Sequence, residues 1–153
     1  TKKLVPWLST GTYGEFEPYK VEPMVLEALL NGSNGITYYS YGDFTDSPFD
    51  FYYHARALSM LRPYEDLVMD GEVLEPEGSN NKMFYSGLKL NKEMLLLVGN
   101  YHNADEKTEF VLPWSRAATI LDLQSNKKLR ARGNKLRFEV PKAGFRLIYI
   151  KGR

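Results

Sequence analysis

The sequence contains no cysteine, which excludes disulfide frameworks and thiolate zinc sites. Only two histidines are present, so a metal site built from several histidines is excluded as well, and we expect neither a metal nor a cofactor. No apolar run approaches the roughly 18 residues that a membrane span requires. The chain does not begin with methionine, and its first residues do not resemble a signal peptide, so we expect a processed chain or a fragment.

Charge is nearly balanced over the 153 residues, with 20 Lys and Arg against 19 Asp and Glu. The two signs are nevertheless separated along the chain. Residues 1–80 carry five basic and 13 acidic side chains, whereas residues 81–153 carry 15 basic and six acidic ones. The basic residues are spread through alternating patterns and form no single run, so we expect solvated strand faces and no nucleic-acid partner.

A turn-rich segment divides the chain. Residues 75–81, with the sequence EPEGSNN, have the composition of a linker. We therefore expect one structural unit over residues 1–74 and a second over residues 82–153.

The first unit has the pattern of two consecutive βα units. A short apolar strand is predicted at residues 4–9, and a helix at 24–30 with Pro23 in its first turn. A β-branched and aromatic strand follows at 35–42, and a second helix is predicted at 50–62. Crossover connections of this kind join parallel strands, so we expect a parallel sheet.

After the linker the hydrophobic period changes to two. Residues 135–140 alternate cleanly between apolar and charged side chains, which is typical of a half-buried strand. Similar runs predict seven short strands in all, at residues 83–88, 94–101, 108–112, 119–123, 128–131, 135–140 and 145–150. This spacing favours an antiparallel β-sandwich.

A parallel sheet of only two strands leaves its edges and faces uncovered. A complete eight-stranded α/β barrel needs about 250 residues, and some 80 are present before the linker. We therefore interpret the chain as α/β plus all-β: the last two βα units of a (β/α)8 barrel of the TIM type, followed by an antiparallel β-sandwich.

Specific strings support this interpretation by resemblance. The first unit resembles the last two βα units of retaining and inverting (β/α)8-barrel glycoside hydrolases, in PWLSTGTYGEFEP, VLEALLNGSNGITYYSYGDF and DFYYHARALSMLRPYEDLVMDGEVL. The second resembles the β-sandwich that closes many such chains, in MLLLVGNY, TEFVLPW, ATILDLQSNKKL and GFRLIYI. The resemblance implies a C-terminal hydrolase fragment with a poly- or oligosaccharide substrate, inactive alone and completed by the rest of the barrel or by a companion chain. Such enzymes are frequently exported, which favours a secreted or periplasmic location.

Candidate site residues are those that follow the predicted parallel strands, because (β/α)8 barrels carry their catalytic and binding residues at the C-terminal ends of the strands. The resemblance implies that Glu15 is a catalytic carboxylate, and glycoside cleavage needs a second one, which this sequence lacks. Asp43 and Glu17 are expected to bind sugar hydroxyls. Tyr13 and Tyr41 are expected to contribute to substrate binding through their aromatic faces. Solvated loop carboxylates, turn-forming aspartate and core tyrosines are the alternatives for these residues.

Two other functions stay open at this stage. The whole chain can be a non-catalytic carbohydrate-binding or structural module, or it can pair with a polypeptide that supplies the other strands. His54, within the second predicted helix, is expected to be a packing residue and not a proton shuttle, because it lies away from the strand ends.

Overall fold

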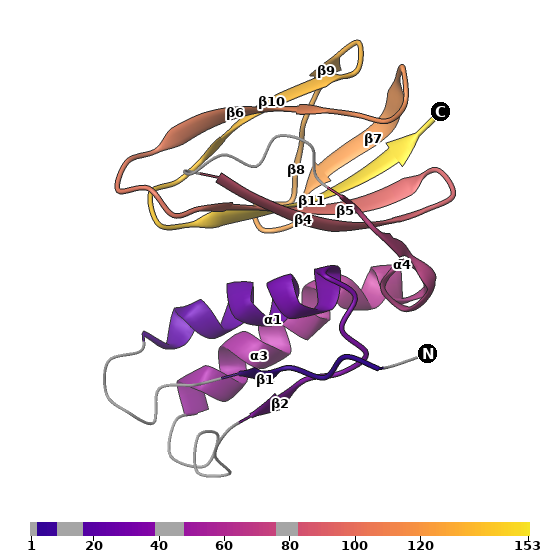
Figure 1. Ribbon diagram of the computed structural model, residues 1–153. Helices are drawn as coiled ribbons and strands as arrows, with labels where there is room; N and C mark the ends of the chain where they lie inside the picture. The colour runs from indigo at the N-terminus through magenta and orange to yellow at the C-terminus, as the bar shows by residue number, and fades with distance from the viewer. Residues whose placement is uncertain (1–2, 9–16, 39–47, 76–82) are drawn as a thin grey trace.

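The computed structural model describes residues 3–8, 17–38, 48–75 and 83–153. Figure 1 shows them as stacked layers: a short pair of strands, a layer of helices, a large sheet and a small sheet. The strand pair and the helices precede the predicted linker, and the two sheets come almost entirely from the chain after it. In these described ranges, no helix is long and apolar enough to cross a membrane.

The outer layer is a two-stranded parallel sheet. Strand β1 (Trp7–Leu8) pairs with β2 (Thr37–Tyr38), and helix α1 (Val21–Leu30) lies between them in the chain. The parallel pairing expected from two consecutive βα units is therefore present. Both strands, as described, are shorter than the sequence predicted.

Helix α1 begins at Val21, three residues before the run predicted at 24–30, and ends at the predicted residue, Leu30. It follows the 3-10 turn η2 (Pro18–Lys20) and holds Pro23 in its first turn, where the missing N–H has no intrahelical partner to lose. Gly32 then adopts a left-handed φ of +82°, and the N–H groups of Gly32 and Ser33 bond back to carbonyls in the last turn. This is the Schellman ending that glycine favours at a helix C-terminus.

The second predicted helix consists of three consecutive helical pieces. They are α3 (Pro48–Leu61), the 3-10 turn η3 (Arg62–Tyr64) and α4 (Glu65–Asp70). Helix α3 begins two residues earlier than predicted, so Asp50 lies inside its first turn. Pro63 follows the end of α3, consistent with the restriction that proline places on the residue before it.

The large sheet has six strands in the order β3-β4-β5-β11-β7-β8, and every neighbouring pair is antiparallel. The strands are β3 (Glu72–Val73), β4 (Met83–Leu90), β5 (Glu93–Asn100), β7 (Ala117–Asp122), β8 (Lys127–Lys128) and β11 (Phe145–Gly152). Strand β3 belongs to this sheet although it precedes the predicted linker. The sheet therefore draws in the last residues of the first part of the chain, and the proposed boundary at residues 75–81 stays a prediction.

The small sheet has three antiparallel strands in the order β6-β10-β9, namely β6 (Glu106–Val111), β9 (Ala131–Arg132) and β10 (Lys135–Val140). In β10, Leu136 and Val140 are buried while the intervening charged residues are exposed, as the alternation predicted. The single strand predicted at 128–131 is wrong: the chain there forms β8 in the large sheet and β9 in the small one. Here the chain passes from one sheet to the other.

The large sheet is buried on both faces along its central strands. In β5, Leu95 and Leu97 pack with the helices, whereas Met94, Leu96 and Val98 pack toward the small sheet. Alternate residues of a strand point to opposite faces, so an uninterrupted apolar run is what a strand between two apolar layers requires. Two separate cores therefore share one sheet.

Apolar exposure is concentrated in the first part of the chain. Among the described residues, ten exposed large hydrophobic side chains precede the linker: Leu4, Val5, Trp7, Tyr19, Phe49, Phe51, Tyr52, Leu58, Met69 and Val73. Two follow it, Tyr101 and Val111. The helices cover one side of the β1–β2 pair, and no described element covers the other (Figure 1).

Candidate functional site

The candidate site lies where β1 and β2 end. Leu8 is the last described residue of β1 and lies opposite Tyr38, the last of β2, so the two parallel strands finish at the same edge. The segments that carry the predicted site residues follow directly in the chain, and in α/β folds this edge is where functional groups gather.

Most of the predicted site residues lie outside the described part of the chain. Glu15 and Tyr13 belong to residues 9–16, and Tyr41 and Asp43 belong to residues 39–47. Their roles therefore stay predictions. Glu17 is the predicted site residue that the structure describes.

Glu17 is an exposed carboxylate held by its neighbours. Its Oε2 accepts a hydrogen bond from the Tyr19 hydroxyl at 2.6 Å and lies 3.3 Å from the Lys20 Nζ. The bond from Tyr19, followed by the interaction with Lys20, lowers the pKa of Glu17. The group is therefore an ionised acceptor at the start of the helical layer, and a carboxylate has further lone pairs for hydroxyl donors.

A second polar group joins the end of β2 to α3. The Tyr38 hydroxyl lies 2.5 Å from Nδ1 of His54, and the two rings meet edge to face with centroids 5.5 Å apart. Asp50, one helical turn before His54, is completely buried. Residues four apart lie on one helix face, so α3 presents both side chains on the side that meets β2.

The electrostatics of this group assign the proton. Burial, together with the charge of Asp50, raises the pKa of Tyr38 to about 12, so its hydroxyl stays protonated at neutral pH. Burial lowers the pKa of His54, which favours the neutral ring. Tyr38 therefore donates to Nδ1, and the second ring nitrogen of His54 carries the ring proton. The arrangement anchors the strand end and gives His54 a packing role. The expectation that His54 lies away from the strand ends is wrong, because it contacts the last residue of β2.

One buried carboxylate was not anticipated from the sequence. Glu22, in the first turn of α1, is almost fully buried and pairs with Arg56 of α3 at 3.3 Å. Its Oε1 has no hydrogen-bond partner in the described structure. Burial raises the pKa of Glu22, and the charge of Arg56 opposes that shift. An acidic residue beside Pro23 is ordinary in a first helical turn, so no sequence signal marked it as buried.

No group of three or more histidine or acidic side chains within the described ranges is placed to hold a metal ion. Nδ1 of His102, in the loop before β6, lies 2.9 Å from Oε1 of Glu106, the first residue of β6.

Comparison with known proteins identifies the fold. No family model and no curated protein sequence matches the chain. Among solved structures, it is similar to the α-amylase from Geobacillus thermoleovorans in complex with acarbose, with a TM-score of 0.72 and 11% identity, covering 99% of this chain and 39% of that one. An Anoxybacillus α-amylase gives 0.68 and 13%, covering 99% and 38%. The α-galactosidase I from Mortierella vinacea gives 0.64 and 14%, covering 94% and 38%.

These neighbours are all glycoside hydrolases, and they match this chain along nearly its whole length. The chain spans less than two-fifths of the length of each. At this identity the likeness is one of fold. The sequence resemblance to part of a glycoside hydrolase is therefore supported at the level of architecture.

Proposed function

We propose that this chain is the C-terminal part of a carbohydrate-active glycoside hydrolase. Residues 1–74 supply the last two βα units of a (β/α)8 barrel, and residues 82–153 form the β-sandwich that follows it. The observation that carries this assignment is the match of 99% of the chain to 39% of an α-amylase at a TM-score of 0.72.

Exposed apolar side chains support the incomplete barrel independently. Trp7 on β1 is 72% exposed, and Phe49 at the start of α3 is 67% exposed. Parallel strands are normally buried on both faces, and large exposed apolar patches mark surfaces that another element covers. In this proposal the further strands and helices of the barrel, in the same protein or in a companion chain, lie against these residues.

The proposed chemistry is glycoside cleavage by two carboxyl groups. Glu15 supplies one of them, and the other comes from the part of the barrel that this chain lacks, so the chain alone is inactive. Asp43 and Glu17 accept hydrogen bonds from sugar hydroxyls, while Tyr13 and Tyr41 pack against sugar rings. The substrate class is a poly- or oligosaccharide.

The test uses the protein encoded by the complete reading frame that contains this chain. We expect that protein to hydrolyse at least one member of a panel of α-glucans, galactosides and xylans. Glu15→Gln should lower kcat by about a thousandfold, because a carboxamide cannot replace the reacting carboxylate. Glu17→Gln should instead raise KM with little change in kcat, because it removes a binding contact. Absence of glycosidase activity, or a Glu15→Gln variant with normal turnover, would contradict the proposal.

A further inference from the structure

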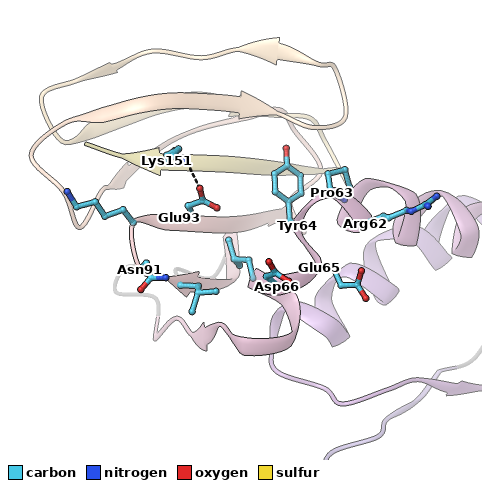
Figure 2. Close-up of a pocket in the computed structure, with 11 residues that line it drawn as sticks. Arg62, Pro63, Tyr64, Glu65, Asp66, Asn91, Glu93 and Lys151 are labelled. Atoms are coloured by element: carbon cyan, nitrogen blue, oxygen red, sulfur yellow. Dashed lines mark hydrogen bonds and ion pairs between the residues drawn. The ribbon is translucent and has the colours of Figure 1, made fainter.

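A groove of about 690 Å³ lies between the helical segment formed by η3 and α4 and the tip of the β4–β5 hairpin (Figure 2). Its volume falls in the range of about 300–1,000 Å³ that is usual for small-molecule sites. Residues from η3 and α4 form one wall, and residues 90–93 with Lys151 of β11 form the other. The residues that line it include Arg62, Tyr64, Asp66, Asn91, Glu93 and Lys151.

One aromatic side chain, that of Tyr64, lines the groove, and Tyr149 is not among the lining residues. Tyr64 stacks on Tyr149 of β11 with ring centroids 4.5 Å apart. Burial, and then a hydrogen bond to Glu93, raise the pKa of Tyr149 to about 12, so its hydroxyl remains a donor at neutral pH. The Tyr64 ring is half-buried and stands in the groove wall in Figure 2.

A fixed carboxylate lies beside these rings. Glu93 accepts a hydrogen bond from the Nζ of Lys151 at 2.6 Å, the dashed contact in Figure 2. This bond, followed by the one from Tyr149, outweighs partial burial and lowers the pKa of Glu93. The carboxylate is therefore ionised and held in one orientation, as a preorganised acceptor should be.

The charges around the groove balance. Three cationic side chains line it, Arg62, Lys92 and Lys151, and so do three anionic ones, Glu65, Asp66 and Glu93. A lining without net charge offers no long-range attraction for polyanions or polycations. It does offer closely spaced donors and acceptors next to an aromatic face, which is the combination that a neutral polyhydroxylated ligand uses.

The groove is distant from the candidate site. In Figure 1, α4 lies at the opposite end of the helical layer from the ends of β1 and β2. In barrel enzymes the catalytic groups gather at the carboxyl ends of the strands. A ligand in this groove is therefore held away from the reacting bond.

We propose that this groove is a second, non-catalytic binding site for a neutral oligosaccharide segment. This inference rests on the proposed function, since it assumes that the protein acts on a saccharide polymer. Tyr64 supplies the apolar face of the ring contact, and Glu93 and Asn91 hydrogen-bond to hydroxyl groups. Anchoring the polymer here raises its local concentration near the catalytic end.

The test measures binding of maltooligosaccharides, galacto-oligosaccharides and xylo-oligosaccharides to the 153-residue chain by calorimetry and by amide chemical shifts. We expect binding of at least one of the three, with shifts at residues of the groove. Tyr64→Ala should weaken it about tenfold. Asn91→Gly is the second variant, because Asn91 has a φ of +54° that glycine adopts freely, so the turn persists while the side-chain amide is lost.

Tyr101→Ala is the matched control, because Tyr101 is an exposed tyrosine that does not line the groove. Its binding should equal that of the unmodified chain. No binding by any of the three saccharides at millimolar concentration would overturn the inference, and so would equal binding by all three variants. Neither result bears on hydrolysis by the longer protein, which is tested separately through Glu15.

Discussion

The strands before the linker and the strands after it differ in how far other elements cover them. In residues 83–153, the central strands have neighbours on both edges and apolar layers on both faces. In the described residues before the linker, a parallel pair with two described residues in each strand is covered on one side by helices and leaves Trp7 largely in solvent. Both parts contain enough apolar residues for a core. The large sheet therefore lies between two apolar layers, one of them formed by the helices of the first part, whereas described elements cover the β1–β2 pair on one side only.

The shared sheet links the two parts. Leu95 and Leu97 of β5 form one core with α1 and α3, so the helices rest on the sheet that the second part builds. The first part is therefore stabilised on its inner side by the second part and is open on its outer side. Loss of the large sheet should unfold both parts, while changes on the outer side should affect neither.

The largest expected effect comes from Leu96→Ala. Leu96 is completely buried between the two sheets, and removal of its side chain leaves a cavity there. We expect the free energy of unfolding to fall by about 2–5 kcal/mol, measured by urea denaturation. Phe51→Ala is the contrasting change on the exposed side of α3, with an expected effect within about 0.5 kcal/mol. Similar losses of unfolding free energy for the two variants would mean that the outer side of α3 is as important for stability as the core between the sheets.

Next in size is Arg56→Met, which leaves Glu22 buried without its ion pair. Stability at pH 7 should fall by about 1–3 kcal/mol, because an uncompensated buried polar group retains its desolvation cost. Glu22→Gln in the same background should restore most of it. A variant as stable as the unmodified chain would mean that Arg56 does not compensate the buried carboxylate.

The pH dependence of this site has a defined sign. Because the folded-state pKa of Glu22 is raised, its stabilising contribution is complete below the unfolded pKa and is lost as the pH rises through the folded pKa. His54 acts in the opposite sense, since its lowered pKa costs stability as the pH falls below its ordinary value. Denaturation of the unmodified chain and of Glu22→Gln between pH 4 and 7 isolates the glutamate. The stability advantage of Glu22→Gln should grow toward pH 7, and a constant difference would contradict this assignment.

A smaller effect is expected where each part buries a tyrosine hydroxyl. Tyr38→Phe removes the bond to His54, and Tyr85→Phe removes the bond to Thr108 that joins the two sheets. Each change should cost about 0.5–1.5 kcal/mol in urea denaturation, the usual contribution of one hydrogen bond. A negligible effect for Tyr38 alone would mean that the strand end is not anchored to α3.

The smallest effect on stability is expected for Trp7→Ser. Since the indole is largely solvated, the free energy of unfolding should change by less than about 0.5 kcal/mol. Binding of a hydrophobic dye to the isolated chain should fall, because the exposed apolar surface is smaller. Unchanged dye binding would show that Trp7 does not contribute to the apolar surface that binds the dye.

Local sequence signals predicted the local structure well. Pro23 marks the first turn of α1, and the alternation at residues 135–140 identified β10 and its buried face. These features depend on neighbours in the chain, which is why the sequence reveals them. The merging of residues 128–131 into one predicted strand shows the limit, because the crossing between sheets depends on partners far away in the chain.

Contacts between distant elements were not predictable in the same way. The bond between Tyr38 and His54, and the burial of Glu22 against Arg56, arise only when β2, α1 and α3 pack together. The run of residues 94–98 is apolar at every position, and composition alone does not assign alternate residues to two different cores. Of the predicted site, Glu17 is described as an ionised, exposed acceptor, and the roles of the other residues remain predictions.

Amide hydrogen exchange on the isolated chain and on the full-length protein tests the central claim most directly. In the isolated chain, the amide of Thr37, which bonds to the Pro6 carbonyl at 3.0 Å, should exchange about a hundred times faster than that of Leu96, a difference of about 2.7 kcal/mol in opening free energy. In the full-length protein, the Thr37 amide should become as protected as that of Leu96. Equal protection of the two amides in the isolated chain would show that the first part needs no further cover and would contradict the incomplete barrel.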